Sequence, residues 1–471
     1  MIAQMEQDAL YDVAVIGSGP GGYVAAIRAG QLGLKTLVVE KDDVLGGTCL
    51  HVGCIPTKAL LYTAELLDTL KHASEFGLAV EGVRLDWVAL QKRKERVVRR
   101  LAAGVSSLFK KNHVETVRGF GKLAGPGKVE VKSDDGVATI RARHIIVATG
   151  SVPRSLPGIG VDGHLVLTSD EMLSLPSRPE SLAIIGAGAV GVEFASMFAS
   201  FGASVTLIEM LPRLLPIEDE EISEALAKAF KKKGIETLPG TRVESVKKEG
   251  DRVSVTFTGP DGHTGTRTVE KLLIAVGRKP RTEGIGLDTV GIEMEKDFVR
   301  VNGFMETSAP NVFAIGDIVP SQQLAHVGSA EGILAVEKIA GLDVTPINYE
   351  HMPSCTYSSP EVASVGLSEA TAKERGYDVK VGRFPFGANS KASILEQREG
   401  FVKIVSEGQY DELLGVHIIG PHATDLIAEA VVALEHEATA QSLMRAVHAH
   451  PTLSESVMEA AHAAEDKPIH V

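Results

Sequence analysis

Residues 11–22 of the 471-residue chain read YDVAVIGSGPGG, an apolar run that ends in a glycine-rich turn. A helical pattern follows over residues 23–32, and a second apolar run over 36–39 closes at Glu40. Strand, G-x-G-x-x-G turn, helix, strand and acid in this order are typical of a dinucleotide-binding unit. The glycines let a pyrophosphate approach the helix N-terminus, and the carboxylate accepts hydrogen bonds from ribose hydroxyls. The stretch therefore predicts an α/β fold that binds a dinucleotide.

The same arrangement recurs over residues 181–209. An apolar run leads into GAGAVG at 186–191, a helix to Phe201, a strand over 203–208 and then Glu209. From first glycine to acid there are 23 residues in both copies. This repeat predicts two dinucleotide sites, the alternative being that one copy is a decayed relic.

Three further apolar runs end in small residues, which would let the backbone pass close to a cofactor. Residues 144–150 close the first glycine unit, and residues 271–278 close the second. The third run, 312–317, ends in Asp317, which we interpret either as a contact to the polar chain of a cofactor or as an ordinary turn residue.

The segment GGTCLHVGCIPTK, Gly46 to Lys58, holds two of only three cysteines. Zinc is disfavoured because no second Cys or His pair accompanies them. A structural disulfide is disfavoured because so short a loop adds little stability to a long chain. A redox-active disulfide fits better, since a thiolate at Cys54 would have a lowered pKa near a helix N-terminus and Lys58.

Composition and charge limit which binding partners and which cellular location we expect for this protein. The net charge of −13 disfavours nucleic acid or an anionic membrane as a partner. No apolar run reaches membrane-spanning length, and residues 1–11 lack the features of a signal or transit peptide. With an odd number of cysteines, we expect a reducing, cytoplasmic location. The basic run 91–100 is either a solvated helix face or a docking site for an acidic partner.

The length and the proline-rich joints predict several domains. We expect an FAD-binding domain with the redox disulfide over residues 1–151, an NAD-binding domain over 152–277 and a central domain completing the FAD site over 278–347. An α+β domain follows over 348–471, with strands near 362–366, 401–404 and 414–419 and helices near 422–437 and 440–447.

Two dinucleotide sites and a dithiol require a carrier that exchanges electrons with both, and flavin does so. The cysteines closely follow the first site, so we expect FAD there and a nicotinamide nucleotide at the second, where Glu209 favours NAD over NADP. Thiol chemistry also needs a base, and His450 with Glu455 offers one. The alternative is that Thr452 and Glu455 only form a capping box for a helix over 454–464.

The segments 46–58 and 450–455 resemble the flavin-dependent pyridine nucleotide–disulfide oxidoreductases, and the resemblance covers nearly the whole chain. It implies two Rossmann-like domains and a C-terminal α+β dimerisation domain in an obligate homodimer. It further implies that Cys54 lies next to the flavin and that Cys49 attacks the substrate. Lys58 and Glu193 would pair beside the flavin. His450 would be the acid/base and Glu455 its partner, both acting from the other subunit.

The resemblance also implies two sets of cofactor contacts. The FAD contacts would be Gly17, Gly19, Gly22, Glu40, Thr48, Lys58, Gly121, Thr149, Gly150, Asp317 and Ala325. The NAD contacts would be Gly186, Gly188, Gly191, Glu193, Glu209, Val243 and Gly277. No metal is expected.

Within this family, Gly191, Glu209 and a C-terminus without cysteines favour the members that oxidise dihydrolipoamide with NAD. The resemblance then implies, as a partner, the lipoyl carrier domain of a 2-oxoacid dehydrogenase or glycine cleavage complex. The alternatives are an NAD(P)H-dependent reductase of another small disulfide such as glutathione, and a binding protein that uses the fold as a scaffold. His51 and Thr57 stand where the family usually has Asn and Ser, and we expect these departures to affect rate or potential.

Overall fold

The computed structural model describes residues 9–471. Residues 1–8, on which part of the N-terminal prediction rests, lie outside the described chain. The chain forms two compact units, each assembled from three separate stretches. The first holds residues up to 59 with 91–153 and 278–349, and the second holds 60–90, 154–277 and 350–471. This division is coarser than the four predicted domains, whose boundaries stay a prediction.

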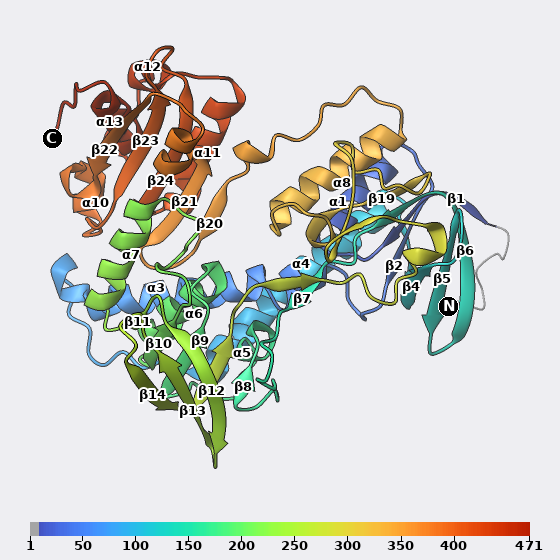
Figure 1. Ribbon diagram of the computed structural model, residues 1–471, viewed down its shortest axis with the longest axis horizontal. Coiled ribbons are helices and arrows are strands. Elements are labelled where there is room, and N and C mark those ends of the chain that lie inside the picture. The colour runs from blue at the N-terminus through green and yellow to red at the C-terminus, as the bar shows by residue number, and fades with distance from the viewer. Residues whose placement is uncertain (1–8) are drawn as a thin grey trace. The chain divides into compact units, whose positions relative to one another are not determined.

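The first unit is organised around a seven-stranded sheet (Figure 1). Strands β3, β2, β1 and β6 lie in that order and run parallel, and β19 pairs in parallel with the end of β6. The first half of β6 pairs instead with an antiparallel hairpin of β4 and β5. The strands are β1 (Leu10–Ile16), β2 (Thr36–Glu40), β3 (Glu115–Arg118), β4 (Phe120–Leu123), β5 (Lys128–Ser133), β6 (Gly136–Val147) and β19 (Val312–Ala314).

Glycines let two helices of this unit, α1 (Pro20–Gln31) and α8 (Ala325–Ile339), approach each other closely. A Cβ atom on Gly21 would lie 2.9 Å from the carbonyl oxygen of Gly328. One on Gly332 would lie 2.6 Å from the carbonyl oxygen of Gly21. The glycine turn before α1 and the turn before α8 are therefore held together by direct backbone packing.

The second unit begins with a five-stranded parallel sheet in the order β11-β10-β9-β15-β8. Its strands are β8 (Val166–Leu167), β9 (Ser181–Ile185), β10 (Ser204–Ile208), β11 (Glu236–Leu238) and β15 (Lys271–Ile274). Helices α6 (Ala189–Ser200) and α7 (Glu220–Lys232) contact this sheet. Three antiparallel strands follow α7 along the chain, namely β12 (Arg242–Glu249), β13 (Arg252–Thr258) and β14 (Thr264–Val269).

The last part of the second unit is a five-stranded antiparallel sheet with helices packed on it. Its order is β20 (Ser354–Thr356), β21 (Glu361–Gly366), β24 (Leu413–Gly420), β23 (Phe401–Glu407) and β22 (Val379–Pro385). Helices α11 (Ala423–Glu435) and α13 (Glu455–Ala464) contact the sheet, and α12 (Ala440–Arg445) contacts α13. The strands and helices predicted for this region from the sequence are thus present, close to their predicted bounds.

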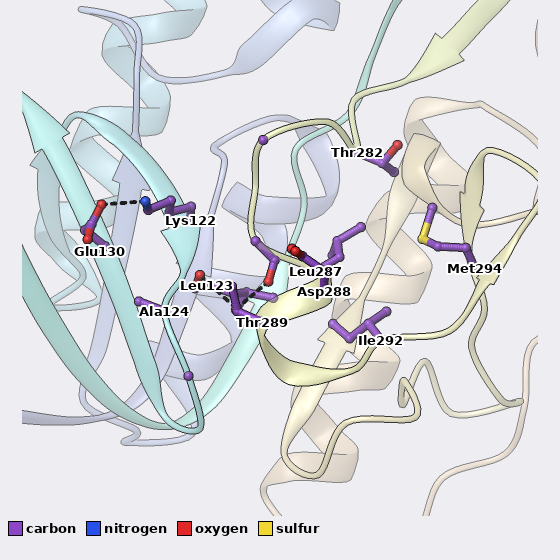
Figure 2. Close-up of a pocket in the computed structure, with 13 residues that line it drawn as sticks. Lys122, Leu123, Ala124, Glu130, Thr282, Leu287, Asp288, Thr289, Ile292 and Met294 are labelled. Carbon is purple, nitrogen blue, oxygen red and sulfur yellow. Dashed lines mark hydrogen bonds and ion pairs between the residues drawn. The ribbon is translucent and has the colours of Figure 1, made fainter.

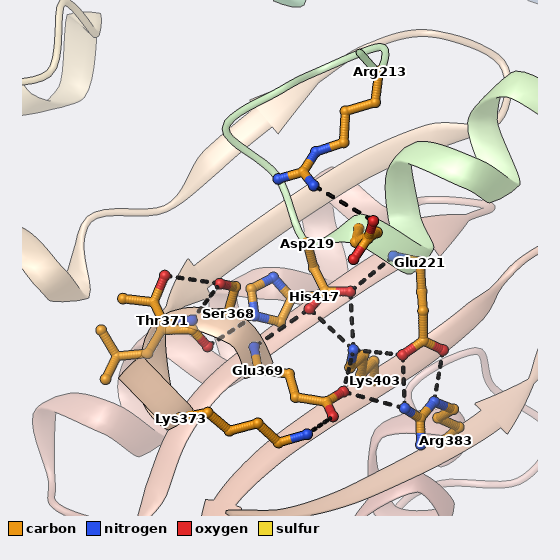
Figure 3. A network of polar contacts seen from close by, with 12 residues as sticks. Arg213, Asp219, Glu221, Ser368, Glu369, Thr371, Lys373, Arg383, Lys403 and His417 are labelled. Carbon is orange, nitrogen blue, oxygen red and sulfur yellow. Dashed lines mark hydrogen bonds and ion pairs between the residues drawn. The ribbon is translucent and has the colours of Figure 1, made fainter. Parts of the chain in front are cut away.

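A buried ion network joins α7 to this antiparallel sheet (Figure 3). The Nζ atom of Lys403, on β23, lies 2.9 Å from Asp219, 2.6 Å from Glu221 and 2.8 Å from Glu369. The lysine and Asp219 side chains are 2% and 3% exposed. Arg383, on β22, also binds Glu221 with two donors, at 2.7 and 2.6 Å. Each buried charge therefore has a partner of opposite sign.

Candidate active site

The first glycine turn has the shape that a dinucleotide pyrophosphate needs. Gly17 has φ +103°, and a Cβ atom there would lie 2.4 Å from the carbonyl oxygen of Ala148. A Cβ atom on Gly22 would lie 2.0 Å from the carbonyl oxygen of Gly17, so the turn and α1 pack too tightly for any side chain. A Cβ atom on Gly19 would meet nothing within 4 Å. The middle glycine thus faces open space at a helix N-terminus, which fits FAD.

Glu40, at the end of β2, is buried and forms hydrogen bonds with this turn. Its Oε2 atom accepts hydrogen bonds from the Ser18 backbone N–H at 2.9 Å and from the Ser18 hydroxyl at 2.6 Å. Its Oε1 atom accepts from the Asp42 N–H at 3.0 Å. The predicted ribose-binding carboxylate is therefore pre-oriented by the turn beside which the ribose would lie.

The second glycine turn repeats this geometry. Gly186 has φ +102°, and a Cβ atom on Gly191 would lie 1.8 Å from the Gly186 carbonyl oxygen. A Cβ atom on Gly188 meets nothing within 4 Å. Glu209 is buried and accepts hydrogen bonds from the N–H groups of Ala187 at 2.6 Å and Leu211 at 2.8 Å. The site fits a second dinucleotide, and its acid leaves little room for a 2′-phosphate charge.

The two-cysteine segment is joined to the first glycine turn. The Gly46 N–H donates to the Ser18 carbonyl oxygen at 3.0 Å and to the Ser18 hydroxyl at 3.2 Å. A Cβ atom on Gly47, where φ is +61°, would lie 2.6 Å from the Cα atom of Gly19. The segment then forms α2 (Gly47–His51) and α3 (Cys54–Lys71). Because α2 begins directly beside the turn, the dithiol is built onto the FAD site.

Cys49, in α2, and Cys54, the first residue of α3, are both thiols, and their side chains are hydrogen-bonded to each other. This hydrogen bond, with burial, raises the pKa of Cys49 far above its usual value, although the charge of Lys58 opposes the shift. Ionisation of Cys49 is therefore disfavoured, and we expect Cys54, at the helix N-terminus, to carry the first negative charge. The predicted helix N-terminus near Cys54 is therefore confirmed, and α3 begins at Cys54 itself.

The two residues predicted to pair beside the flavin lie on different elements. Lys58 is on α3, one turn beyond Cys54, and it acts on the cysteine pair through its charge. Glu193 is buried on α6, where its Oε1 atom accepts a hydrogen bond from the Tyr357 N–H at 3.0 Å. Their contact with each other stays a prediction.

Asp317 lies in a 3-10 turn (Gly316–Ile318) after β19, where it is held by polar neighbours. Its Oδ2 atom accepts a hydrogen bond from the Ser151 hydroxyl. The Arg278 Nε atom donates to the same hydroxyl at 2.6 Å and lies 3.8 Å from the Asp317 carboxylate. Ser151 and Arg278 therefore hold the carboxylate in place, and its contact with a cofactor stays a prediction.

The other predicted cofactor contacts lie at strand ends and turns. Thr149 donates its hydroxyl to the Arg281 carbonyl oxygen at 2.8 Å, and Gly150 has φ +70°. Thr48 lies in α2, Gly121 in β4, Ala325 at the start of α8, Val243 in β12 and Gly277 just after β15. The cofactor contacts of all these residues stay predictions.

Sequence reasoning gave no role to Glu331, which lies on α8 with 0% of its surface exposed. Its Oε2 atom accepts the Gly316 N–H at 2.6 Å, and its Oε1 atom accepts the Tyr349 hydroxyl at 2.9 Å. Burial raises the pKa of this carboxyl group. Glu331 therefore supports the turn that presents Asp317. An acid between Ala330 and Gly332 in an otherwise apolar helical stretch was the available signal.

His450 and Glu455 lie together in the second unit. The Nδ1 atom of His450 is 2.9 Å from Oε1 of Glu455, and the imidazole is 69% exposed. The second carboxylate oxygen of Glu455, the first residue of α13, accepts the Thr452 N–H at 2.8 Å. Burial alone would raise the pKa of Glu455, but the hydrogen bonds from Thr452 and His450 lower it. Glu455 thus serves the helix start and the histidine at once.

The first unit has a further pocket between the β4–β5 hairpin and residues 282–294 (Figure 2). Its Lys122 and Glu130 side chains form an ion pair with each other at 2.8 Å. No residue predicted for the active site lines it. Elsewhere, no helix of residues 9–471 has both the length and the apolar character to cross a membrane.

Comparisons with known proteins agree with this geometry. Residues 11–332 match the family described as pyridine nucleotide-disulphide oxidoreductase, and residues 352–461 match its dimerisation domain. A dihydrolipoyl dehydrogenase of Bacillus subtilis is 48% identical over 471 residues, covering 98% of this chain and 99% of that protein. One of Chlorobaculum tepidum is 46% identical, covering 96% and 97%.

Solved structures give the same result. The crystal structure of LpdA from Mycobacterium tuberculosis has a TM-score of 0.89 at 28% identity and covers 96% of this chain and 99% of that chain. The resemblance inferred from Gly46–Lys58 is therefore confirmed, together with the predicted fold class. Two glycine turns, a dithiol fixed to the first of them and matches along nearly the whole length establish that this chain belongs to the pyridine nucleotide-disulphide oxidoreductase family.

Proposed function

We propose that this enzyme oxidises dihydrolipoamide to lipoamide and reduces NAD⁺ to NADH, using the Cys49–Cys54 pair. The observation that carries the proposal is the hydrogen-bonded thiol pair built onto the first dinucleotide turn. The activity named for relatives with 46% and 48% identity supports the choice of substrate. Bound FAD supplies two-electron exchange between sulfur and nicotinamide.

The protein's own residues then perform thiol–disulfide exchange. In the oxidised enzyme, His450 takes a proton from one substrate thiol, and that thiolate attacks the Cys49 sulfur. The Cys49–Cys54 bond breaks, a mixed disulfide forms and Cys54 leaves as a thiolate. The second substrate thiol gives its proton to solvent, and the resulting thiolate attacks the substrate sulfur of the mixed disulfide. This releases Cys49 as a thiolate, which takes the first proton back from His450. Two electrons have thus passed from the substrate to the protein pair.

The assignment of these roles follows from the surroundings of each group. Cys49 keeps its proton in the dithiol while Cys54 holds charge, so Cys54 is the better leaving thiolate. Glu455 holds Nδ1 of His450, which leaves Nε2 to exchange protons. Lys58 stabilises negative charge on the pair, and we propose that Glu193 pairs with it.

We further propose the partners and the location of the enzyme. The dimerisation domain supports a homodimer, in which His450 and Glu455 would complete the site of the other subunit. The substrate would arrive on the lipoyl carrier domain of a 2-oxoacid dehydrogenase or glycine cleavage complex, in the cytoplasm.

Steady-state turnover tests the proposal against its alternatives. We expect NAD⁺ reduction by free dihydrolipoamide, lost in Cys49→Ser although that variant keeps its FAD. Reduction of glutathione disulfide with NADPH, without dihydrolipoamide oxidation, would select the other disulfide reductase. An FAD-containing protein with neither activity would be a binding protein.

A further inference from the structure

Helix α4 (Trp87–Lys111) carries a row of cations that nothing in the proposed chemistry uses. Over residues 91–111 there are eight basic residues and one acidic residue, in a chain whose net charge is −13. Six of the basic side chains are exposed and lie on one side of the helix by their spacing. We call them the α4 basic face: Lys92, Arg96, Arg99, Arg100, Lys110 and Lys111.

The cations of the α4 basic face are unpaired. Within residues 9–471, none of these six side chains forms an ion pair or a hydrogen bond with another residue. By contrast Lys94, on another side of the helix, is buried and bonded to Gln91 at 2.6 Å. Unpaired like charges along one helix repel one another, so the face gains from an anionic partner.

The opposite side of the same helix is buried in an apolar cluster to which the redox segment contributes Leu50. Val105 and Phe109 are buried in the apolar cluster that contains Leu50, which stands between the two cysteines in sequence. The Arg93 guanidinium also donates to the Ala59 carbonyl oxygen on α3 at 2.8 Å. The α4 basic face therefore stands one helix diameter, roughly 10 Å, outside the redox segment.

We propose that the α4 basic face is a docking surface for an acidic protein domain that carries the dihydrolipoyl group. This inference rests on the proposed function, and it adds a carrier-recognition surface to it. A carrier domain needs attraction at a place beside the thiol pair, and charge complementarity supplies attraction without a large apolar interface. Small side chains, Ala103 and Ser107, separate the two groups of cations and leave room for a partner.

A protein fits this face better than two other anionic partners. Single-stranded nucleic acid is bound with aromatic side chains on which bases stack, and the exposed positions of residues 91–111 include none. A membrane-surface helix needs a broad apolar side that is free to insert, whereas on α4 Val105 and Phe109 are buried and only Leu101 and Leu108 of residues 91–111 are exposed large apolar side chains.

Steady-state kinetics of the FAD-containing dimer provide the test. The variant is Arg96→Glu with Arg99→Glu, and the matched control is Lys128→Glu with Lys132→Glu, two exposed cations on β5. Each protein is assayed for NAD⁺ reduction with an acidic dihydrolipoyl carrier domain and with free dihydrolipoamide, which is uncharged. A second variant, Arg96→Gln with Arg99→Gln, removes the two charges without reversing them, and it provides the test if the charge-reversed protein misfolds.

With the carrier domain, we expect kcat/KM of the Arg96/Arg99 reversal to fall about 10-fold or more at low salt. Wild-type kcat/KM with the carrier should fall as salt rises, and the variant should lose most of this dependence. Free dihydrolipoamide should give unchanged kinetics in every variant, and the β5 control should match wild type throughout.

Unchanged carrier kinetics in the Arg96/Arg99 variants would overturn the docking proposal. An equal loss in the β5 control would overturn it too, because only overall charge would then matter. Saturable binding of duplex DNA or anionic vesicles that is lost in the variants, with carrier kinetics intact, would assign the face to another partner and also overturn it. Wild-type enzyme inactive with free dihydrolipoamide would instead refute the proposed function.

Discussion

Cys49 and Cys54 have different roles because their surroundings differ. Cys54 begins a helix and accepts the hydrogen bond of Cys49, whereas Cys49 is half-buried near Tyr23. Burial raises the pKa of Tyr23, so this hydroxyl stays neutral at physiological pH. These surroundings support the proposed division of roles, in which Cys49 meets the substrate and Cys54 holds the charge.

His450→Gln should lower kcat with dihydrolipoamide by about 100-fold or more, because the base for thiolate formation is lost. Glu455→Gln should lower it less, since an amide still binds Nδ1 but no longer stabilises imidazolium. Steady-state NAD⁺ reduction measures both. Lys58→Met is the comparison, and a larger loss there than in His450→Gln would contradict the assignment.

Glu331→Ala should weaken FAD retention. The change leaves the Gly316 N–H and the Tyr349 hydroxyl without their acceptor in a buried place, at a cost of about 1–3 kcal/mol each. Flavin fluorescence released on heating, compared with loss of secondary structure, measures the effect. Tyr349→Phe, which removes only one of the two bonds, should release flavin at an intermediate temperature. Release unchanged from wild type would refute a supporting role.

At the residue scale, the sequence identified residues that belong to a recognisable motif. It did not identify the residues that hold those motif residues in place. Cys49, His450 and Glu455 stand in recognisable spacings, and the last two are confirmed as neighbours. Glu331 and the Ser151–Arg278 contact to Asp317 join residues far apart in the chain. No local pattern records such pairs, because they depend on which turns the fold brings together.

At the scale of elements, the two βαβ units use their glycines in the same way. In each, the third glycine of the turn packs its Cα against the carbonyl oxygen of the first. In each, the acid at the end of the second strand accepts the N–H of the residue after that first glycine. The sequence pattern of strand, glycine turn, helix, strand and acid predicted both units, because all these contacts lie within one such unit.

Gly191→Ala should raise the KM for NAD⁺ without reducing FAD content. An added Cβ would lie 1.8 Å from the Gly186 carbonyl oxygen, so the turn must shift and its N–H groups with it. Kinetics at varied NAD⁺ and the flavin-to-protein ratio test this. Gly160→Ala is the control, since a Cβ atom there meets no protein atom within 4 Å and the residue lies outside the predicted NAD contacts. A normal KM in Gly191→Ala would show that the turn adapts.

Lys403→Met should lower stability by about 3–5 kcal/mol, because it leaves the Asp219 carboxylate buried without its cation. Lys373→Met, whose side chain is 58% exposed at the edge of the same network, should cost about 1 kcal/mol or less. Thermal unfolding followed by circular dichroism compares them. Equal losses of stability in the two variants would mean that burial of the Lys403 ion pair does not increase its contribution to stability.

The same network makes a pH prediction. Arg383 and Lys403 lower the pKa of Glu221 to about 2 from its ordinary 4.5. A carboxyl group with a depressed pKa stabilises the fold above its ordinary value and loses that contribution as pH falls toward the lowered one. Acid unfolding of Lys403→Met should therefore begin at higher pH than that of wild type. The five charged residues of this network come from two strands, two helices and the turn before α7, which the sequence alone did not connect.

For the whole molecule, the family places a dimerisation domain over residues 352–461, which contains His450 and Glu455. Two inactive chains should therefore complement each other if these residues act across the interface. Mixed and reassembled Cys49→Ser and His450→Gln subunits should regain about a quarter of wild-type activity. Half of the random dimers are then mixed, and each has one complete site.

The control for complementation is a mixture of Cys49→Ser with Cys54→Ser, in which no dimer has a complete thiol pair. Activity of the first mixture no higher than that of this control would place His450 in the same subunit as the cysteines it serves. Analytical ultracentrifugation of each mixture should show dimers throughout.

The join between the cysteine segment and the first glycine turn has a practical consequence. Ser18 and Gly19 contact Gly46 and Gly47 directly. The side chains from Lys41 to Val44 are exposed, so we expect this span not to determine the positions of the two sulfur atoms. A peptide tag inserted between Asp43 and Val44, or new chain ends opened there by circular permutation, should leave the redox chemistry untouched. A site that tolerates insertion would then lie about a dozen residues or fewer before the two cysteines of the redox pair.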